Sequence, residues 1–355
     1  MLRSYRASDA VQCFIDDESV DLWFEAIKDI NRELLEPYRR QAGKRVKIGI
    51  LDTGIDLGQR AFDREDVRRR IKKVVDFCGE GSGRDRCGHG TYCAALINKI
   101  APAADVYVGR VAIDTDSRLD ENVVAEAIEV ALSPKRSGHA SSNWDVDILS
   151  LSLSFPYYSE VIDRAIRRSN TMGKIILAAA SNSGLGTLSN MAYPAWNEGV
   201  IAINSANARG RPSDFNPPVV EGKTLTILGE NVPSAWATVA TAEAGGAAAD
   251  IAATKRLSGT AVATPIAAGL VALLIELAMI EIPIDPQTQA ILKDVLPHVK
   301  RQAGVNILLK RVAVKTGDYY NIVPVNLLNP SLTVYENAAF IKGILARWFN
   351  FRKGD

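Results

Sequence analysis

The chain has 355 residues, of which 47% are hydrophobic and 23% are charged. This composition is typical of a soluble globular protein and excludes a chain that is disordered throughout. Lys and Arg number 42 and Asp and Glu 41, so the formal net charge is +1. A nearly neutral chain gives no reason to expect a general nucleic-acid-binding surface, and we predict none.

Cysteine content and the first residues bear on the compartment. The cysteines are Cys13, Cys78, Cys87 and Cys93, too few for a disulfide scaffold in a chain of this length. The first ten residues lack the apolar segment of a secretory signal. We therefore expect reduced thiols and an intracellular protein, in the first instance a cytoplasmic one.

The chain begins with a predicted helical segment. Apolar residues recur with a helical period over residues 16–41. Pro37 and Gly43 are expected to end this helix. Residues 1–45 are therefore predicted to form a helical extension ahead of the main domain.

Strand-like apolar runs recur after residue 45. They cover residues 46–52, 104–111, 145–153, 174–180 and 199–206, and helical patterns at 120–132 and 158–170 lie between some of them. Nearly continuous apolar runs are typical of strands that are buried on both faces of a parallel sheet. Their alternation with helices predicts a three-layer, doubly wound α/β domain with a mainly parallel sheet, over residues 46–302.

Residues 261–280 contain one charged residue, Glu276. The segment is long enough to cross a bilayer, but it contains Pro265 and Gly269, and no basic cluster flanks it. We interpret it as a helix buried in the core of the domain and expect no association with a membrane.

The rest of the chain has weaker patterns. Residues 241–259 are rich in Ala, Gly and Thr and are predicted to form loops and tight turns, whereas residues 286–302 are predicted to be a helix. Residues 303–355 are expected to be a C-terminal appendage packed on the core.

Two motifs place reactive side chains at predicted element ends. Asp52 directly follows a buried strand, at the edge of the sheet where open α/β sheets place their sites. His89 lies between Gly88 and Gly90 at the start of an apolar helix. A histidine held in this way is well placed to reach a reacting group.

A third motif gives the resemblance to a family. Residues 259–265 read Gly-Thr-Ala-Val-Ala-Thr-Pro. Together with Asp52 and His89 upstream, they resemble the subtilisin-like serine protease family (peptidase S8, subtilases), whose triad follows the order Asp, His, Ser. The family pattern is Gly-Thr-Ser-Met-Ala-x-Pro, so Ala261 stands at the position of the nucleophile.

The resemblance covers roughly residues 46–280 and implies roles for further residues. His89 would be the general base, Asp52 its partner, and Asn182 the side chain of the oxyanion hole. The N-terminal helix and residues 317–324 are closest in style to intracellular subtilase domains of filamentous fungi. The resemblance implies no cofactor, and the helix after His89 lacks the inserted loop that holds calcium in secreted subtilisins.

The resemblance also implies a substrate-binding surface. An extended polypeptide would pair with the segment at residues 152–154. The residues expected to contact substrate are all uncharged: Ser152, Leu153, Ser154, Ala179, Ser181, Ser183 and Ala192. A neutral pocket favours an apolar side chain before the scissile bond, because a buried Lys or Arg would find no partner there.

Ala261 lacks the hydroxyl needed to form an acyl-enzyme, so the chain is expected to be inactive. We favour an engineered Ser→Ala change, because Asp52, His89 and Asn182 are all retained. The alternative is a natural pseudoprotease that acts as a peptide-binding or signalling module, with partner domains that the sequence does not identify. A third hypothesis, a metal-dependent hydrolase through Cys87, His89 and Cys93, lacks the ligand spacing of a zinc site, and we predict no metal.

Overall fold

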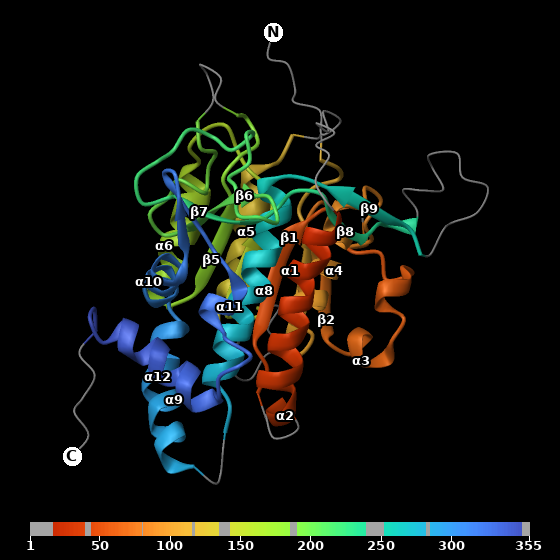
Figure 1. The fold of residues 1–355 in the computed structure, drawn as a ribbon. Helices are drawn as coiled ribbons and strands as arrows, with labels where there is room; N and C mark the ends of the chain where they lie inside the picture. Colours follow the sequence, from red (N-terminus) through yellow and green to blue (C-terminus); the bar gives the residue numbers. More distant parts are fainter. Residues whose placement is uncertain are drawn as a thin grey trace.

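A computed structural model describes residues 17–39, 44–79, 81–115, 118–134, 143–184, 190–238, 252–281 and 285–349. Its centre is a nine-stranded sheet with the strand order β10-β11-β7-β6-β5-β4-β1-β3-β2 (Figure 1). Every neighbouring pair in this sheet is parallel except β10 and β11. The predicted α/β class with a mainly parallel sheet is therefore confirmed.

The predicted apolar runs all form strands of this sheet, at β1, β3, β4, β5 and β6. The strands of the main sheet are β1 Lys47–Asp52, β2 Ile71–Asp76, β3 Asp105–Arg110, β4 Ile148–Leu151, β5 Ile175–Ala179, β6 Ile201–Ala206, β7 Leu225–Leu228, β10 Val314–Thr316 and β11 Tyr319–Asn321. A separate antiparallel pair is formed by β8 Val232–Ala235 and β9 Thr254–Leu257. Strand β9 corrects the prediction of loops over 241–259, in the part of that segment that the structure describes. It is mostly exposed, so pairing with β8 rather than burial makes it a strand.

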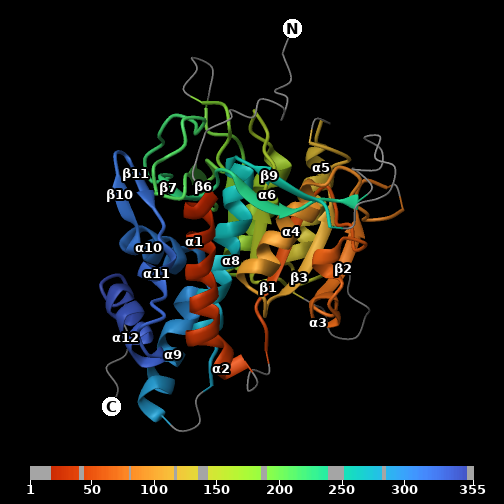
Figure 2. The ribbon, with the colours of Figure 1, turned by 45° about the vertical axis from the view of Figure 1, so that its right-hand side comes forward.

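Helices cover both faces of the sheet (Figure 2). They are α1 Asp17–Asp29, η1 Ile30–Leu35, α2 Glu36–Arg39, η2 Arg60–Phe62, α3 Glu65–Arg68, α4 His89–Ile100, α5 Glu121–Leu132, α6 Glu160–Thr171, α8 Thr260–Ala278, α9 Pro286–Val299, α10 Gln302–Val312, α11 Pro324–Leu327 and α12 Val334–Leu345. Two apolar clusters fill the space between the layers. One includes buried residues of α1, α4 and α8, and the other includes those of α5 and α6.

The sequence analysis expected Pro37 to help end the N-terminal helix, but the helix continues past it. The chain stays helical to Arg39, because a π-helical segment, η1, precedes the short helix α2 that contains Pro37. Pro37 is the second residue of α2 and follows directly on η1, in which the N–H of Glu36 bonds to the carbonyl of Asn31, five residues back. The wider π-helical turn replaces the i→i−4 pattern that a proline disrupts. The apolar face of α1 and η1 is almost fully buried in the core next to α4 and α8.

Helix α8 runs through the middle of the protein. By length and composition it could cross a membrane, but 89% of its most apolar window is buried inside the protein. That burial is the one expected of a core helix, as the sequence analysis interpreted it.

The segment after residue 302 contributes to the sheet as well as packing on it. Tyr320 of β11 pairs with Leu225 of β7, so the segment extends the main sheet by two strands. Val305, Leu309 and Ile341 are buried in the same core as α8. The expected packing on the core is thus present, and the division of the chain at residues 45 and 302 stays a prediction.

Candidate active site

Three elements bring the predicted catalytic residues to one edge of the sheet. Asp52 is the last residue of β1, His89 is the first of α4, and Ala261 is the second of α8. The start of α4 lies so close to the turn after β1 that a Cβ on Gly90 would be 2.2 Å from the carbonyl oxygen of Gly54. Glycine at position 90 is therefore required for His89 to approach Asp52.

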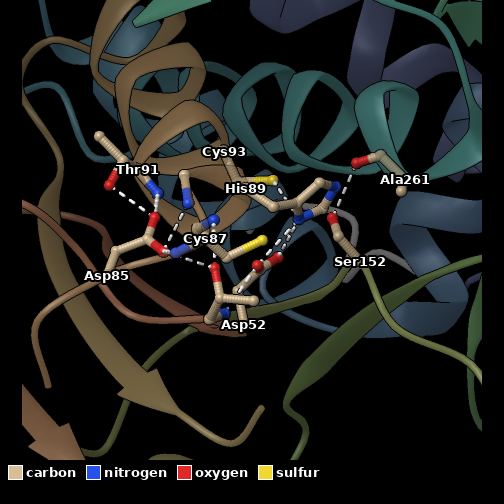
Figure 3. A network of polar contacts seen from close by, with 11 residues as sticks. Asp52, Asp85, Cys87, His89, Thr91, Cys93, Ser152 and Ala261 are labelled. Carbon is tan, nitrogen blue, oxygen red and sulfur yellow. Dashed lines mark hydrogen bonds and ion pairs between the residues drawn. The ribbon is translucent and has the colours of Figure 1, made fainter. Parts of the chain in front are cut away.

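His89 and Asp52 form a direct pair. His89 Nδ1 lies 2.8 Å from Asp52 Oδ1 and 3.0 Å from Oδ2, and the carboxylate is almost fully buried. Figure 3 shows the opposite edge of the imidazole turned toward Ala261. Burial is the largest single effect on the pKa of His89 and would lower it. The charge and hydrogen bond of Asp52, together with the neighbouring Cys93, outweigh burial and hold that pKa well above the ordinary value.

A second buried carboxylate, Asp85, organises the turn that carries His89. Its Oδ1 accepts hydrogen bonds from Thr53 Oγ1 and from the backbone N–H groups of Cys87 and Gly88, at 2.7–3.0 Å. Its Oδ2 accepts from both the N–H and the hydroxyl of Thr91 (Figure 3). Asp85 therefore ties the residue after Asp52 to the first turn of α4.

The sequence analysis assigned no role to Asp85. Its partners are mostly backbone groups, which leave no trace in residue types. One signal was present: an Asp shortly before the start of a helix is typical of a residue that accepts from the first N–H groups of that helix.

Asn182, the predicted oxyanion-hole residue, is fixed by the start of α8. Its Oδ1 accepts from the N–H of Thr260 at 2.8 Å and from the Thr260 hydroxyl at 3.0 Å. The amide nitrogen Nδ2 is thus the atom left to donate toward the site. Ser181, which directly precedes Asn182, has a φ of 134°, which is uncommon for a residue other than glycine.

The predicted substrate-binding segments are hydrogen-bonded to one another. Residues 152–154 follow β4, and the next residue, Phe155, pairs with Tyr193 through two backbone bonds. Ala192 donates to the carbonyl of Ala180 at the end of β5, which Ala179 precedes and Ser181 follows. The Ser152 hydroxyl donates to the carbonyl of Ala261 at 2.8 Å. The predicted pocket residues therefore lie on three segments that are hydrogen-bonded to one another: residues 152–154, residues 179–183, and Ala192.

The structure does not bring together the three residues of the alternative metal hypothesis, Cys87, His89 and Cys93. Among the described residues, the group that could share an ion is Asp52, His89 and Cys93, without Cys87. Cys93 is fully buried with Sγ 3.8 Å from His89 Nδ1, the nitrogen that already pairs with Asp52. Burial raises the pKa of both thiols, which opposes the thiolate that a metal requires. Cys78, Cys87 and Cys93 are not joined in disulfides, and Cys13 lies outside the described residues.

The mainly parallel sheet, with Asp52, His89 and position 261 at its carboxyl edge, defines a protein of the subtilisin-like class. Residues 43–312 match the model of the subtilase family, Peptidase S8, and the chain belongs to that family.

Individual proteins that the chain resembles are consistent with membership of the subtilase family. The chain is 29% identical to subtilisin BL from Lederbergia lenta over 245 residues, 66% of this chain and 78% of that protein. It is 28% identical to an intracellular serine protease from Paenibacillus polymyxa over 257 residues, 68% of this chain and 70% of that protein. The structure of the prenylagaramide maturation protease PagA shares the fold, with a TM-score of 0.60 at 19% identity, over 89% of this chain and 98% of that one.

Proposed function

We propose that the chain carries the active site of a subtilisin-like serine endopeptidase in a form that lacks the nucleophile. The observation that carries this proposal is the Asp52–His89 pair, with the far edge of the imidazole facing Ala261. That is the arrangement needed for a residue at position 261 to lose a proton to His89.

With serine at position 261, each group has a defined task. The N–H on His89 Nδ1 is held by Asp52, so Nε2 is free to accept the proton of the serine hydroxyl. The oxygen then bonds to the scissile carbonyl carbon, and the amide of Asn182 donates to the oxygen that becomes negative. His89 gives its proton to the leaving amine, and water releases the acyl group by the same steps in reverse order.

The proposed substrate is a polypeptide bound in extended form, and no cofactor takes part. Residues 152–154 would supply the edge to which its backbone pairs. By its resemblance to intracellular relatives such as the protease of P. polymyxa, we place the chain inside the cell, in the cytoplasm.

The alternative function is a pseudoprotease that binds peptides without cutting them. The observation that favours it is Ala261 itself, since every contact described above can form without a serine. Sequencing codon 261 in the natural gene distinguishes a natural alanine from an engineered one.

Ala261→Ser tests the proposal directly. We expect the variant to cleave casein and to be labelled at residue 261 by a fluorophosphonate, whereas a variant that also carries His89→Ala should do neither. A folded Ala261→Ser chain that neither cleaves casein nor reacts with the fluorophosphonate would leave peptide binding as the better account.

The pocket makes a further prediction about specificity. The Ala261→Ser chain should prefer Leu, Met or Phe before the scissile bond, because Ala179, Ser183 and Ala192 offer no charge to a buried Lys or Arg. Profiling cleavage sites in a proteome-derived peptide library measures this preference. A dominant preference for basic or acidic residues would show that the pocket has been assigned to the wrong residues.

A further inference from the structure

Two helices carry catalytic positions at their N-terminal ends and meet a common segment at their C-terminal ends. Helix α4 starts at His89 and ends at Ile100, and α8 carries Ala261 in its first turn and ends at Ala278. At a rise of ~1.5 Å per residue, these helices are about 18 Å and 28 Å long. The N-terminal segment of residues 17–39 lies alongside α8 in both views (Figure 1, Figure 2).

A polar bridge links the C-terminal ends of the two helices. Asn31 Nδ2 donates to the carbonyl of Ile100 at 3.0 Å, and Asn31 Oδ1 accepts from Arg39 Nη2. The guanidinium of Arg39 also binds both carboxylate oxygens of Glu276, at 2.6 Å and 3.2 Å. Asn31 and Arg39 thus connect the last residue of α4 to the last turn of α8.

The chemistry of this bridge suits a contact that fixes how α4 and α8 are aligned with each other. Glu276 is the one charged residue of α8, and its side chain is 17% exposed. A largely buried carboxylate adds little stability compared with an apolar residue, but a bidentate Arg partner fixes geometry strongly. The carbonyl of Ile100 belongs to the last turn of α4, where it has no intrahelical donor, and Asn31 supplies one.

Local packing places Asn31 accurately. It lies in the π-helical segment η1, which buries Ile30, Leu34 and Leu35 beside it. π-helical turns are rare in proteins, and those that occur are often found at functional sites. Ile100 also packs directly on α8, since a Cβ on Gly269 would lie 2.8 Å from its Cγ2. A displacement at this junction would therefore be passed to both helices.

We propose that residues 17–39 form a brace that sets the alignment of α4 and α8, and hence the position of His89 relative to residue 261. Asn31, Arg39 and Glu276 are its positioning residues. The proposal rests on the proposed function, because it assigns the brace a role in the reaction. Residues 17–39 lie outside the part of the chain that matches the family model, 43–312, so membership of the family does not supply this role.

The kinetic test uses Arg39→Met in the Ala261→Ser chain. We expect kcat to fall at least about tenfold with KM changed by less than about twofold, because displacements well under 1 Å at the reacting atoms carry costs of this size. Arg39→Lys keeps the charge but loses the bidentate contact, so it should retain an intermediate kcat. The matched control is Arg32→Met on the same segment, whose ion pairs with Asp29 and Glu33 are exposed and whose loss should leave kcat unchanged.

A second measurement needs no hydrolysis. In the chain with Ala261, the ring of His89 is titrated by NMR in the Arg39→Met and Arg32→Met variants. We expect Arg39→Met alone to move the midpoint by about half a pH unit, because it alters the Asp52–His89 contact. If Arg39→Met does not fold, Arg39→Lys is measured by both methods.

The two measurements separate the brace from the proposed function. If Arg39→Met shifts the His89 midpoint but the Ala261→Ser chain hydrolyses nothing, the proposed function is wrong. The link between the brace and His89 is then still supported. Folded Arg39 variants with an unchanged kcat and an unchanged midpoint would overturn the brace and reduce residues 17–39 to a packing element.

Discussion

Ala261→Ser should raise kcat for hydrolysis of a chromogenic peptide by about 10⁶-fold over the chain with alanine. This is the size of the loss when the serine of a subtilisin triad is removed. The expectation applies here because His89 is already paired with Asp52 at 2.8 Å and Asn182 is already fixed on Thr260. Serine would therefore enter a site whose other groups are in place. Steady-state hydrolysis of a p-nitroanilide with Leu or Phe before the scissile bond measures the change.

The matched control is Asp52→Asn in the same Ala261→Ser chain. It should lower kcat by about 10⁴-fold, because the amide can hold His89 in the wrong tautomer. A kcat within tenfold of the parent would show that Asp52 is not the partner of the general base.

The pH dependence of the folding stability and of the reaction rate gives a second test of the Asp52–His89 pair. The pKa of His89 is raised by Asp52 against the effect of burial. The pair therefore stabilises the folded chain fully below the ordinary histidine value of about 6.5, and this contribution is lost as the pH rises through the raised pKa. The rate of the Ala261→Ser chain should rise over that higher range, as His89 becomes a neutral base. Asp52→Asn should move this rise to lower pH.

The strands that could be predicted are those that are buried on both faces. The runs at β1, β3, β4, β5 and β6 are nearly continuous in apolar residues, so the residue types themselves indicate burial. Strand β2 lies at the edge of the sheet and contains Lys72 and Lys73. It therefore lacks the apolar run by which the buried strands were predicted. Strands β10 and β11 have three residues each and depend on pairing with β7, which the local sequence does not show.

The same distinction holds for the site. Asp52 and His89 could be placed because each lies at the end of a recognisable element. The role of Glu276 could not, although its charge stood out in an apolar helix, because its partner Arg39 lies 237 residues away in the chain. Ion pairs between distant segments depend on how helices pack, and neither periodicity nor spacing carries that information.

Asp85→Asn should lower the free energy of unfolding by about 3–5 kcal/mol, because Asp85 is fully buried and accepts hydrogen bonds from five donors. Asparagine has the same shape, but its NH₂ group would face donors in either orientation. One orientation loses the bonds from Thr53, Cys87 and Gly88, and the other loses both bonds from Thr91. Urea unfolding measures the loss, with Asp214→Asn as the control.

The Asp214 side chain is 94% exposed, so this control should stay within about 0.5 kcal/mol of the parent. In the Ala261→Ser chain, Asp85→Asn should also lower kcat at temperatures where the variant is folded, since the turn it holds carries His89 and, through Thr53, adjoins Asp52. A loss of stability below about 1 kcal/mol, with kcat unchanged, would show that the turn before α4 holds its shape without this carboxylate.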